Sequence, residues 1–178
     1  MKIIEGLKQL KYLHEKADDL INKIKANCAL SQMDTPEYGD NQRQVVDGWI
    51  QSHFDILKEI EKISLAIQRT NLQVEVTIEI DGVQVTKPIS AWILWRGNQK
   101  KGNNGLAHKH LSAWSVLGDR GIKEGNTTKT PGGETVIVKI IRYFDAKTRD
   151  HKREVFMQMP TQIDQTLEII NATTDLIF

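Results

Sequence analysis

The side chains best suited to chemistry in this 178-residue chain lie between positions 92 and 114. The segment RGNQKKGNNG at 96–105 carries glycines and cationic groups, and tryptophans lie on both sides of it. An indole face can stack on a nucleotide base while Lys and Arg bind the phosphates. This pattern predicts a phosphate-binding or nucleotide-binding site; in the alternative interpretation the tryptophans fill the core and the loop is only solvated. The residues of the pattern are Trp92, Trp95, Arg96, Lys100, Lys101, His108, Lys109 and Trp114.

Two glycine-containing segments, GNQKKGNNG and KTPGGET, resemble loops that present backbone N–H groups to phosphate. Neither matches a P-loop or a dinucleotide-binding fingerprint, so ordinary solvated loops are the alternative. His108 and His110 lie two residues apart, and side chains at that spacing do not face each other on a helix. A bound anion beside Lys109 therefore fits them better than a metal ion.

His14 and His53 fall within the predicted apolar stripes of two long helices. One interpretation is a pH-sensitive or metal-binding pair. The other is a polar layer that sets the register of the helices, and it is favoured because zinc needs three or four ligands. Cys28 is the single cysteine, which excludes an intramolecular disulfide and a cysteine-based zinc site. A reducing cytoplasm is the expected compartment.

Motifs for catalysis are missing from the sequence. It contains no GxSxG and no HExxH, and its acidic residues alternate with Lys on helix surfaces, as at 58–62. We therefore expect a protein that is not an enzyme, with no catalytic residue, no metal and no cofactor. If it were an enzyme, a nucleotide phosphodiesterase that uses His108 and His110 is the form to test.

Overall composition narrows the class of protein. Hydrophobic residues make up 39% and charged residues 26%, as in ordinary globular domains. The net charge of +1 argues against strong non-specific nucleic-acid binding, although residues 96–129 are locally basic. The chain contains no apolar run long enough for a signal peptide or a membrane span, so no membrane partner is expected.

Apolar residues at alternating steps of three and four predict helices at 2–29 and 42–70, which form an antiparallel hairpin. Turn residues occupy 30–41 between them. The expected stripe of the first helix is Ile3, Leu7, Leu10, His14, Ala17, Ile21, Ile24 and Cys28. That of the second is Val46, Trp49, His53, Ile56, Ile60, Ile63 and Ile67.

The rest of the chain mixes short strands with helices. Alternation over 74–80 and 83–87, joined by Asp81-Gly82, predicts a β-hairpin. Residues 88–118 are expected to form two helices broken by a polar loop, or one long strained helix. Residues 119–133 are expected to be a loop. A second hairpin is expected between 135–144 and 153–159, followed by a helix from 160 to 171.

These elements predict a helix-rich α+β fold, with a long antiparallel helical hairpin, two small β-hairpins and further helices. Residues 1–178 are expected to be a single domain. Its parts are the helical hairpin at 1–71, a β-hairpin with helices and a basic polar loop at 72–133, and a β-hairpin with the last helix at 134–178.

Polar residues gather at two predicted helix ends, 69–71 and 171–175. Local capping explains both patches, and each also supplies ligand donors and acceptors, so Arg69, Asn71, Asn171 and Asp175 join the candidate ligand-binding residues.

The same two ends carry a family resemblance. IQRTN at 67–71, the Asp81-Gly82 turn and IINATTDL at 169–176 resemble the septicolysin-like family of small helical bacterial and phage proteins, whose function is unknown. The resemblance covers about half of the chain. It departs from the family in the longer, more basic segment 96–133, in the 135–159 hairpin and at Ala172, where Trp is common. The resemblance implies a helical, oligomeric architecture and brings no catalytic residue.

The expected function is that of a non-catalytic, homo-oligomeric binding protein for a small phosphorylated ligand, with nucleotides as the expected class. The phage members of the family suggest sequestration of a nucleotide immune signal, such as a cyclic nucleotide or an ADP-ribose derivative. Oligomerisation is expected because one hairpin leaves many Ile and Leu side chains without partners. The alternative function is a structural or protein–protein interaction module with no small-molecule ligand.

Overall fold

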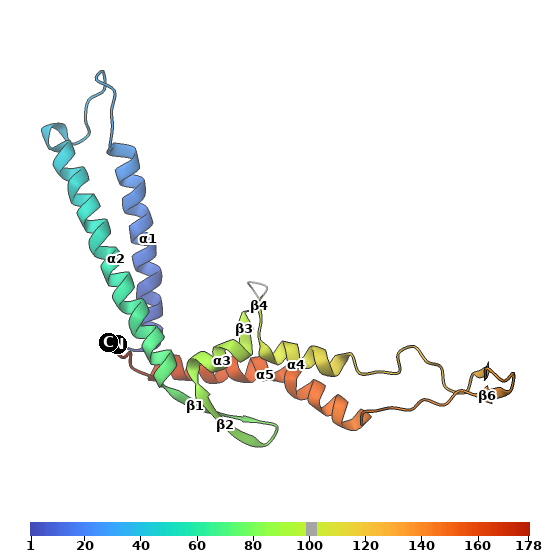
Figure 1. Ribbon diagram of the computed structural model, residues 1–178. Coiled ribbons are helices and arrows are strands. Elements are labelled where there is room, and N and C mark those ends of the chain that lie inside the picture. Colours follow the sequence, from blue (N-terminus) through green and yellow to red (C-terminus); the bar gives the residue numbers. More distant parts are fainter. Residues whose placement is uncertain (99–102) are drawn as a thin grey trace. The chain divides into compact units, whose positions relative to one another are not determined.

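The computed structural model describes residues 1–98 and 103–178 of the chain. It confirms the helix-rich α+β class, in which long helices are combined with small two-stranded sheets (Figure 1). In chain order the elements are α1 (Ile3–Asn27), the 3-10 helix η1 (Gly39–Asn41), α2 (Gln42–Gln73), β1 (Glu75–Ile80), β2 (Val83–Pro88), α3 (Ile89–Arg96), β3 (Gly97–Asn98), β4 (Asn103–Asn104), α4 (Leu106–Ser115), β5 (Thr127–Lys129), β6 (Thr135–Ile137) and α5 (Ala146–Thr173). No helix within the described residues is long and apolar enough to cross a membrane.

The chain divides into two compact units. The hairpin unit contains Met1–Glu75 and Leu167–Phe178, and the insert unit contains Val76–Thr166. The insert unit therefore lies, in sequence, between the two segments that build the hairpin unit. As a result, the hairpin unit needs both ends of the described chain.

Helices α1 and α2 run side by side in opposite directions, as the sequence predicts (Figure 1). Gln9 Nε2 donates to Glu59 Oε1 at 2.7 Å, and Gln42 Nε2 donates to the Asn27 carbonyl at 2.9 Å. These two bonds set the register of the hairpin. Between the helices lies the seam, whose buried residues are Ile3, Gly6, Leu13, Ala17 and Leu20 of α1 and Ile56, Ile63, Ala66, Ile67 and Thr70 of α2.

The position of the α1 seam differs from the predicted stripe. His14 is exposed, as are Leu7, Ile21 and Cys28, so the expected placement of His14 in the seam, opposite a half-buried His53, is wrong. The seam instead follows Gly6, Leu13 and Leu20, because the small Gly6 allows a close approach. A Cβ atom at Gly6 would lie 2.7 Å from Leu176 Cδ1. This packing turns the stripe of Leu7, His14 and Ile21 toward solvent.

Backbone hydrogen bonds join the two ends of the hairpin unit. The Ile3 N–H donates to the Thr174 carbonyl at 3.0 Å, and the Leu176 N–H donates to the Met1 carbonyl at 2.8 Å. The buried Thr70 hydroxyl accepts the Ile177 N–H at 2.9 Å and donates to the Ala66 carbonyl at 2.7 Å. The end of α2 and the segment that follows α5 therefore meet at Thr70.

The insert unit begins with the predicted β1–β2 hairpin. Its turn residues Asp81 and Gly82 have φ values of 55° and 73°, as a two-residue hairpin turn of this sequence requires. Asp81 also receives hydrogen bonds from His151 Nε2 at 2.6 Å and Lys152 Nζ at 2.5 Å. These contacts attach the tip of the hairpin to the first turns of α5.

Helices α3 and α4 confirm the expectation of two helices broken by a polar segment, rather than one long helix. The described arms of that segment pair as β3 and β4, with Gly97 opposite Asn104. In the core of the insert unit, Trp92 Nε1 donates to the Val76 carbonyl at 2.9 Å. The unit's other buried apolar residues are Val76, Ile78, Ile89, Ala107, Met159 and Ile163.

The second predicted β-hairpin is wrong. Residues 153–159 lie within α5, and the strand expected at 135–144 is reduced to β6, which pairs with β5 across Thr130 to Glu134. The buried α5 residues Met159, Ile163 and Leu167 are spaced by four, a helical period. The sequence predicts a helix that starts near Pro160, a residue that is common at the first helical position, whereas the structure places Pro160 inside the helix.

Candidate functional site

A cleft of about 350 Å³ lies between α3 and α4 in the insert unit. It contains Arg96 and Lys109 from the predicted pattern, and the described residues that line it include no acid. The lining residues are Ser90, Ile93, Leu94, Arg96, Gly97, Asn98, Gly105, Leu106 and Lys109. Helix α3 supplies one wall, and the start of α4 supplies the other.

The start of α4 contributes a backbone donor to the cleft lining. Gly105 is the N-cap residue and makes no side-chain cap. The N–H group of Leu106, the first residue of α4 and part of the cleft lining, has no partner inside the helix, as at every helix start. Gly105 itself is buried, and a Cβ atom there would overlap the backbone of Trp95, Arg96 and Gly97. Close packing of the α3 end against the α4 start thus leaves an uncapped helix N-terminus, which favours an anion.

The two cationic side chains of the cleft differ in whether they already have an ion-pair partner. Arg96 Nη1 donates to Asp164 Oδ1 at 2.8 Å, and its Nε donates to the Gly97 carbonyl at 3.2 Å. These two hydrogen bonds fix the position of the Arg96 guanidinium, and the Asp164 carboxylate offsets part of its charge. Lys109 is exposed and has no ion-pair partner among the described residues. Lys109 is therefore the cation with most capacity for an added anion.

The tryptophans do not form an open stacking surface. Trp92 is only 1% exposed, so it cannot contact a ligand in this structure. Trp95 is half-buried and stacks on His110, with centroids 5.2 Å apart, while Lys87 Nζ lies 5.2 Å from its ring centroid. Trp114 is half-buried on α4. The core-filling interpretation applies to Trp92.

His108 and His110 have separate surroundings. His108 is exposed on α4, whereas the His110 ring lies between Trp95 and Phe156, with centroids 4.9 Å apart on the Phe156 side. The two rings do not converge on one point, as expected for residues two apart on a helix. The described residues contain no group of three or more His, Cys, Asp or Glu side chains placed to hold a metal ion.

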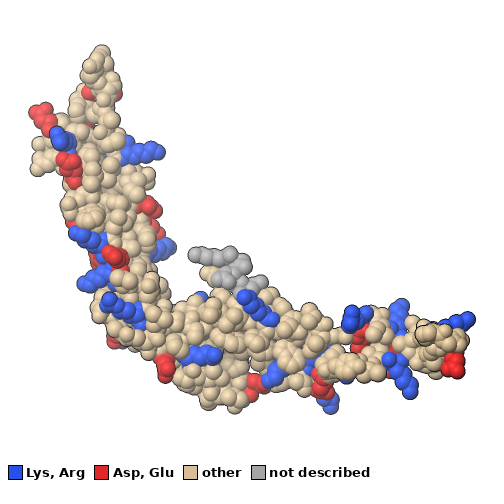
Figure 2. Space-filling view, viewed as in Figure 1, with Lys and Arg blue, Asp and Glu red and all other residues tan. Residues whose placement is uncertain are grey.

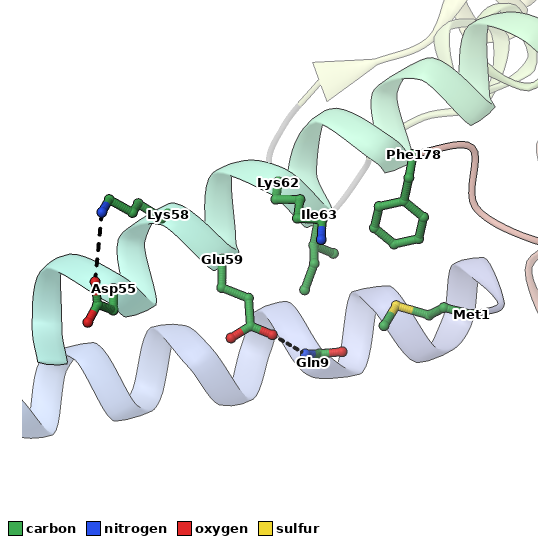
Figure 3. Close-up of a pocket in the computed structure, with 8 residues that line it drawn as sticks. All are labelled: Met1, Gln9, Asp55, Lys58, Glu59, Lys62, Ile63 and Phe178. Carbon is green, nitrogen blue, oxygen red and sulfur yellow. Dashed lines mark hydrogen bonds and ion pairs between the residues drawn. The ribbon is translucent and has the colours of Figure 1, made fainter.

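Arg69 lies in a different place, on a surface groove of the hairpin unit. That groove has a volume of about 370 Å³ and also includes Leu65 and Phe178. Beside it lies a groove of about 400 Å³, in which Lys62 points toward the Phe178 ring (Figure 3). There Lys58 pairs with Asp55 at 3.8 Å, so acids offset the cations. The α3–α4 cleft therefore suits an anion better.

The other predicted residues of the helix ends belong to the hairpin unit. Asn71 and Asn171 are half-buried at the ends of α2 and α5. Asp175 pairs with Lys2 Nζ at 2.6 Å, and this hydrogen bond is the largest cause that lowers the pKa of Asp175. Because this pair joins the two chain ends, the local structural interpretation accounts for Asp175.

Two further predictions concern loops. Lys100 and Lys101 lie outside the described residues. In KTPGGET, the Gly133 N–H donates to the Thr130 carbonyl, and the Glu134 N–H donates to Thr130 Oγ1. These N–H groups close the β5–β6 hairpin, so the segment is a turn rather than a phosphate loop.

Sequence reasoning did not identify Ser90 or Leu94 as parts of the cleft, and it included Gly105 only as the last residue of the GNQKKGNNG segment. Gly105 is the one that a local pattern could have revealed, because a glycine directly before a helix gives no side-chain cap. Ser90 and Leu94 carry no such pattern. On the face drawn in Figure 2, Lys and Arg are interspersed with Asp and Glu, so attraction of an anion depends on local geometry.

Comparisons of this chain with protein-family models, curated proteins and solved structures give no match. The resemblance to the septicolysin-like family therefore stays a prediction.

Proposed function

We propose that this chain is a non-catalytic binding protein for a small phosphorylated ligand, held in the α3–α4 cleft. The observation that carries the proposal is the uncapped N-terminus of α4 beside Lys109 in a cleft whose described lining residues include no acid. A phosphate there would accept a backbone N–H bond and pair with Lys109, while Arg96 provides a second, pre-positioned cation. Nucleotides are the first ligand class to test.

The role proposed for such binding is sequestration of a nucleotide signal, in line with the phage members of the resembled family. Sequestration requires binding without turnover. It is compatible with the separate surroundings of His108 and His110, whose rings do not converge on one point.

Isothermal titration calorimetry with inorganic phosphate, ADP and adenosine tests the proposal. Phosphate and ADP should bind, and adenosine, which has no phosphate, should bind much more weakly. Lys109→Ala should weaken ADP binding by about tenfold or more, because a charge-assisted hydrogen bond contributes roughly 1.5–3 kcal/mol. Lys8→Ala, which removes an exposed lysine of α1, is the matched control and should change nothing. Absence of binding, or equal effects of both substitutions, overturns the proposal.

The second candidate function is an interaction module without a small-molecule ligand. It is favoured by exposed apolar residues along the hairpin, including Leu7, Ile21, Ile50 and Leu57. Lys109→Ala in a thermal melt separates the candidates. Under the first, nucleotides lose their stabilising effect in a thermal melt. Under the second, melting and assembly stay unchanged and nucleotides have no effect with either protein.

A further inference from the structure

We propose that one side of the α1–α2 hairpin is a two-fold interface with a second copy of this chain, with α1 packed antiparallel on α1 of the partner. The apolar flank consists of Ile4, Leu7, His14, Ile21, Ile50 and Leu57. This inference names the partner that the second candidate function leaves open, and it does not depend on ligand binding in the α3–α4 cleft.

The two sides of the hairpin differ in polarity. The hydrogen bond between Gln9 and Glu59 marks one side of the seam. At 100° per residue, Leu7, His14 and Ile21 project from α1 on the other side, and Ile50 and Leu57 project from α2 there. Leu7, Ile21, Ile50 and Leu57 are 45%, 49%, 51% and 45% exposed. These apolar side chains lack a partner within the hairpin unit, and the exposed Lys11 and Asp18 of α1 project in the same direction between Leu7 and Ile21.

The size of the flank matches a small stable interface. From Ile4 to Ile21 the flank is about 25 Å long at 1.5 Å per residue, and two packed helices are about 20 Å wide. Pairing two copies through this whole face of the hairpin, its charged residues included, would bury roughly 1,000 Å² in total, about the lower bound for a specific interface.

The positions of the charged residues Lys11 and Asp18 favour a second copy of the chain as the partner, and they favour one of two possible two-fold arrangements. A two-fold axis that lies in the plane of the interface, perpendicular to the helix axes and level with His14, stacks α1 antiparallel on the partner's α1. Leu7 then lies level with Ile21 of the partner subunit, and Lys11 lies level with Asp18 of the partner subunit. Leu7 is therefore matched with an apolar residue and Lys11 with an opposite charge, whereas Lys25, which projects in the same direction as Leu7, lies level with Ile4 of the partner subunit.

The other two-fold arrangement is disfavoured. An axis parallel to the helices stacks α1 on the partner's α2. The register set by Gln9 and Glu59 would then place Lys11 on Leu57 of the partner subunit and Asp18 on Ile50 of the partner subunit. Both charges would lose water against apolar side chains, which costs free energy.

The test uses disulfide formation in the full chain carrying Cys28→Ser, because Cys28 is exposed. His14→Cys places a thiol beside the axis, and oxidation should give a covalent dimer. Lys16→Cys, on the side of Gln9, is the matched control and should remain monomeric on a denaturing gel. Crosslinking of Lys16→Cys in preference to His14→Cys overturns the proposal.

Light scattering coupled to size-exclusion chromatography gives the second readout. Wild type should be a dimer. Lys11→Asp or Asp18→Lys alone should weaken the dimer by roughly fivefold, and the double exchange should restore it. A monomeric wild type, or a double exchange as weak as the single ones, overturns the interface. If the wild type is a monomer that still binds ADP, the interface is overturned and the proposed ligand-binding function is not.

Discussion

Several single residues in this protein determine the local path or the hydrogen bonding of the backbone. Gly105 permits the end of α3 to pass directly against the start of α4, and this approach forms the cleft. Thr70 satisfies a backbone N–H and a carbonyl with one buried hydroxyl. Asp81 accepts a left-handed turn conformation and at the same time anchors that turn to α5.

Gly105→Ala should strongly destabilise the insert unit. The added Cβ overlaps backbone atoms, which cannot move aside as a flexible side chain would, so a cost of about 3 kcal/mol or more is expected. Chemical denaturation followed by circular dichroism measures it. Gly118→Ala is the control, because nothing lies within 4 Å of the added atom and its φ is not positive. Equal stability of the two variants would contradict the close packing.

Asp81→Asn should remove stability in a pH-dependent way. The hydrogen bond from Lys152, followed by that from His151, lowers the pKa of Asp81 below its ordinary value of 3.8. The charged carboxylate therefore stabilises the fold above that value, and the effect is lost as the pH falls through the lowered pKa. Asparagine keeps the turn, since it also tolerates positive φ.

Thermal melts of wild type and Asp81→Asn across acid and neutral pH provide the measurement. The difference in Tm should be largest near neutral pH and should shrink once the pH falls below 3.8. A difference in Tm that is constant over the whole pH range would mean that the Asp81 charge does not contribute to its contacts with His151 and Lys152.

Among the elements, α5 departs most from local rules. It continues through Pro160, whose ring removes one backbone donor and crowds the preceding turn. Burial of Met159 and Ile163 in the insert unit and of Leu167 in the hairpin unit outweighs this cost. Tertiary packing thus maintains a helix that the proline disfavours.

Pro160→Ala should stabilise the protein by about 2 kcal/mol, because it restores a helical N–H and removes the clash, less the entropy that proline takes from the unfolded chain. Urea denaturation at equilibrium measures the change. Thr161→Ala, at the exposed neighbouring position, serves as the control and should alter stability by only a few tenths of a kcal/mol. A destabilised Pro160→Ala protein would show that proline sets the local path of α5.

At the scale of the molecule, the hairpin unit is closed by its two chain segments. Leu176 and Leu167 are buried, and Leu176 lies against Gly6. The backbone bonds of Ile3 with Thr174 and of Met1 with Leu176 complete the closure. Stability of the α1–α2 hairpin therefore depends on a distant segment of the chain, Leu167–Phe178.

A chain that ends after Thr166 should lose protection in α1 and α2. Removal of Leu167 and Leu176 exposes the Gly6 end of the seam, and burial of two leucines contributes about 3–6 kcal/mol. Hydrogen–deuterium exchange of peptides from 3–20 and 56–70 reports this loss. Phe178→Ala removes a side chain that is 54% exposed and should leave protection nearly intact. Unchanged exchange after truncation would refute the closure.

Local periodicity was sufficient for much of this architecture. The ends of α1 and α2, the Asp81-Gly82 turn and the division between α3 and α4 depend on residues near one another in sequence, so pattern and turn chemistry predict them. The candidate cations Arg96 and Lys109 followed from the same local pattern, and they meet in one cleft.

Other features depend on contacts between distant segments. His14 lies outside the α1 seam because the seam follows Gly6, which packs against Leu176. Helix α5 continues through Pro160 because its apolar face is buried. Trp92 is buried and cannot stack on a ligand, because its indole N–H donates to a carbonyl of β1. Local propensity differs by only about 1 kcal/mol per residue in most cases, whereas burial of a large side chain contributes about 1.5–3 kcal/mol, so tertiary packing decides where the two conflict.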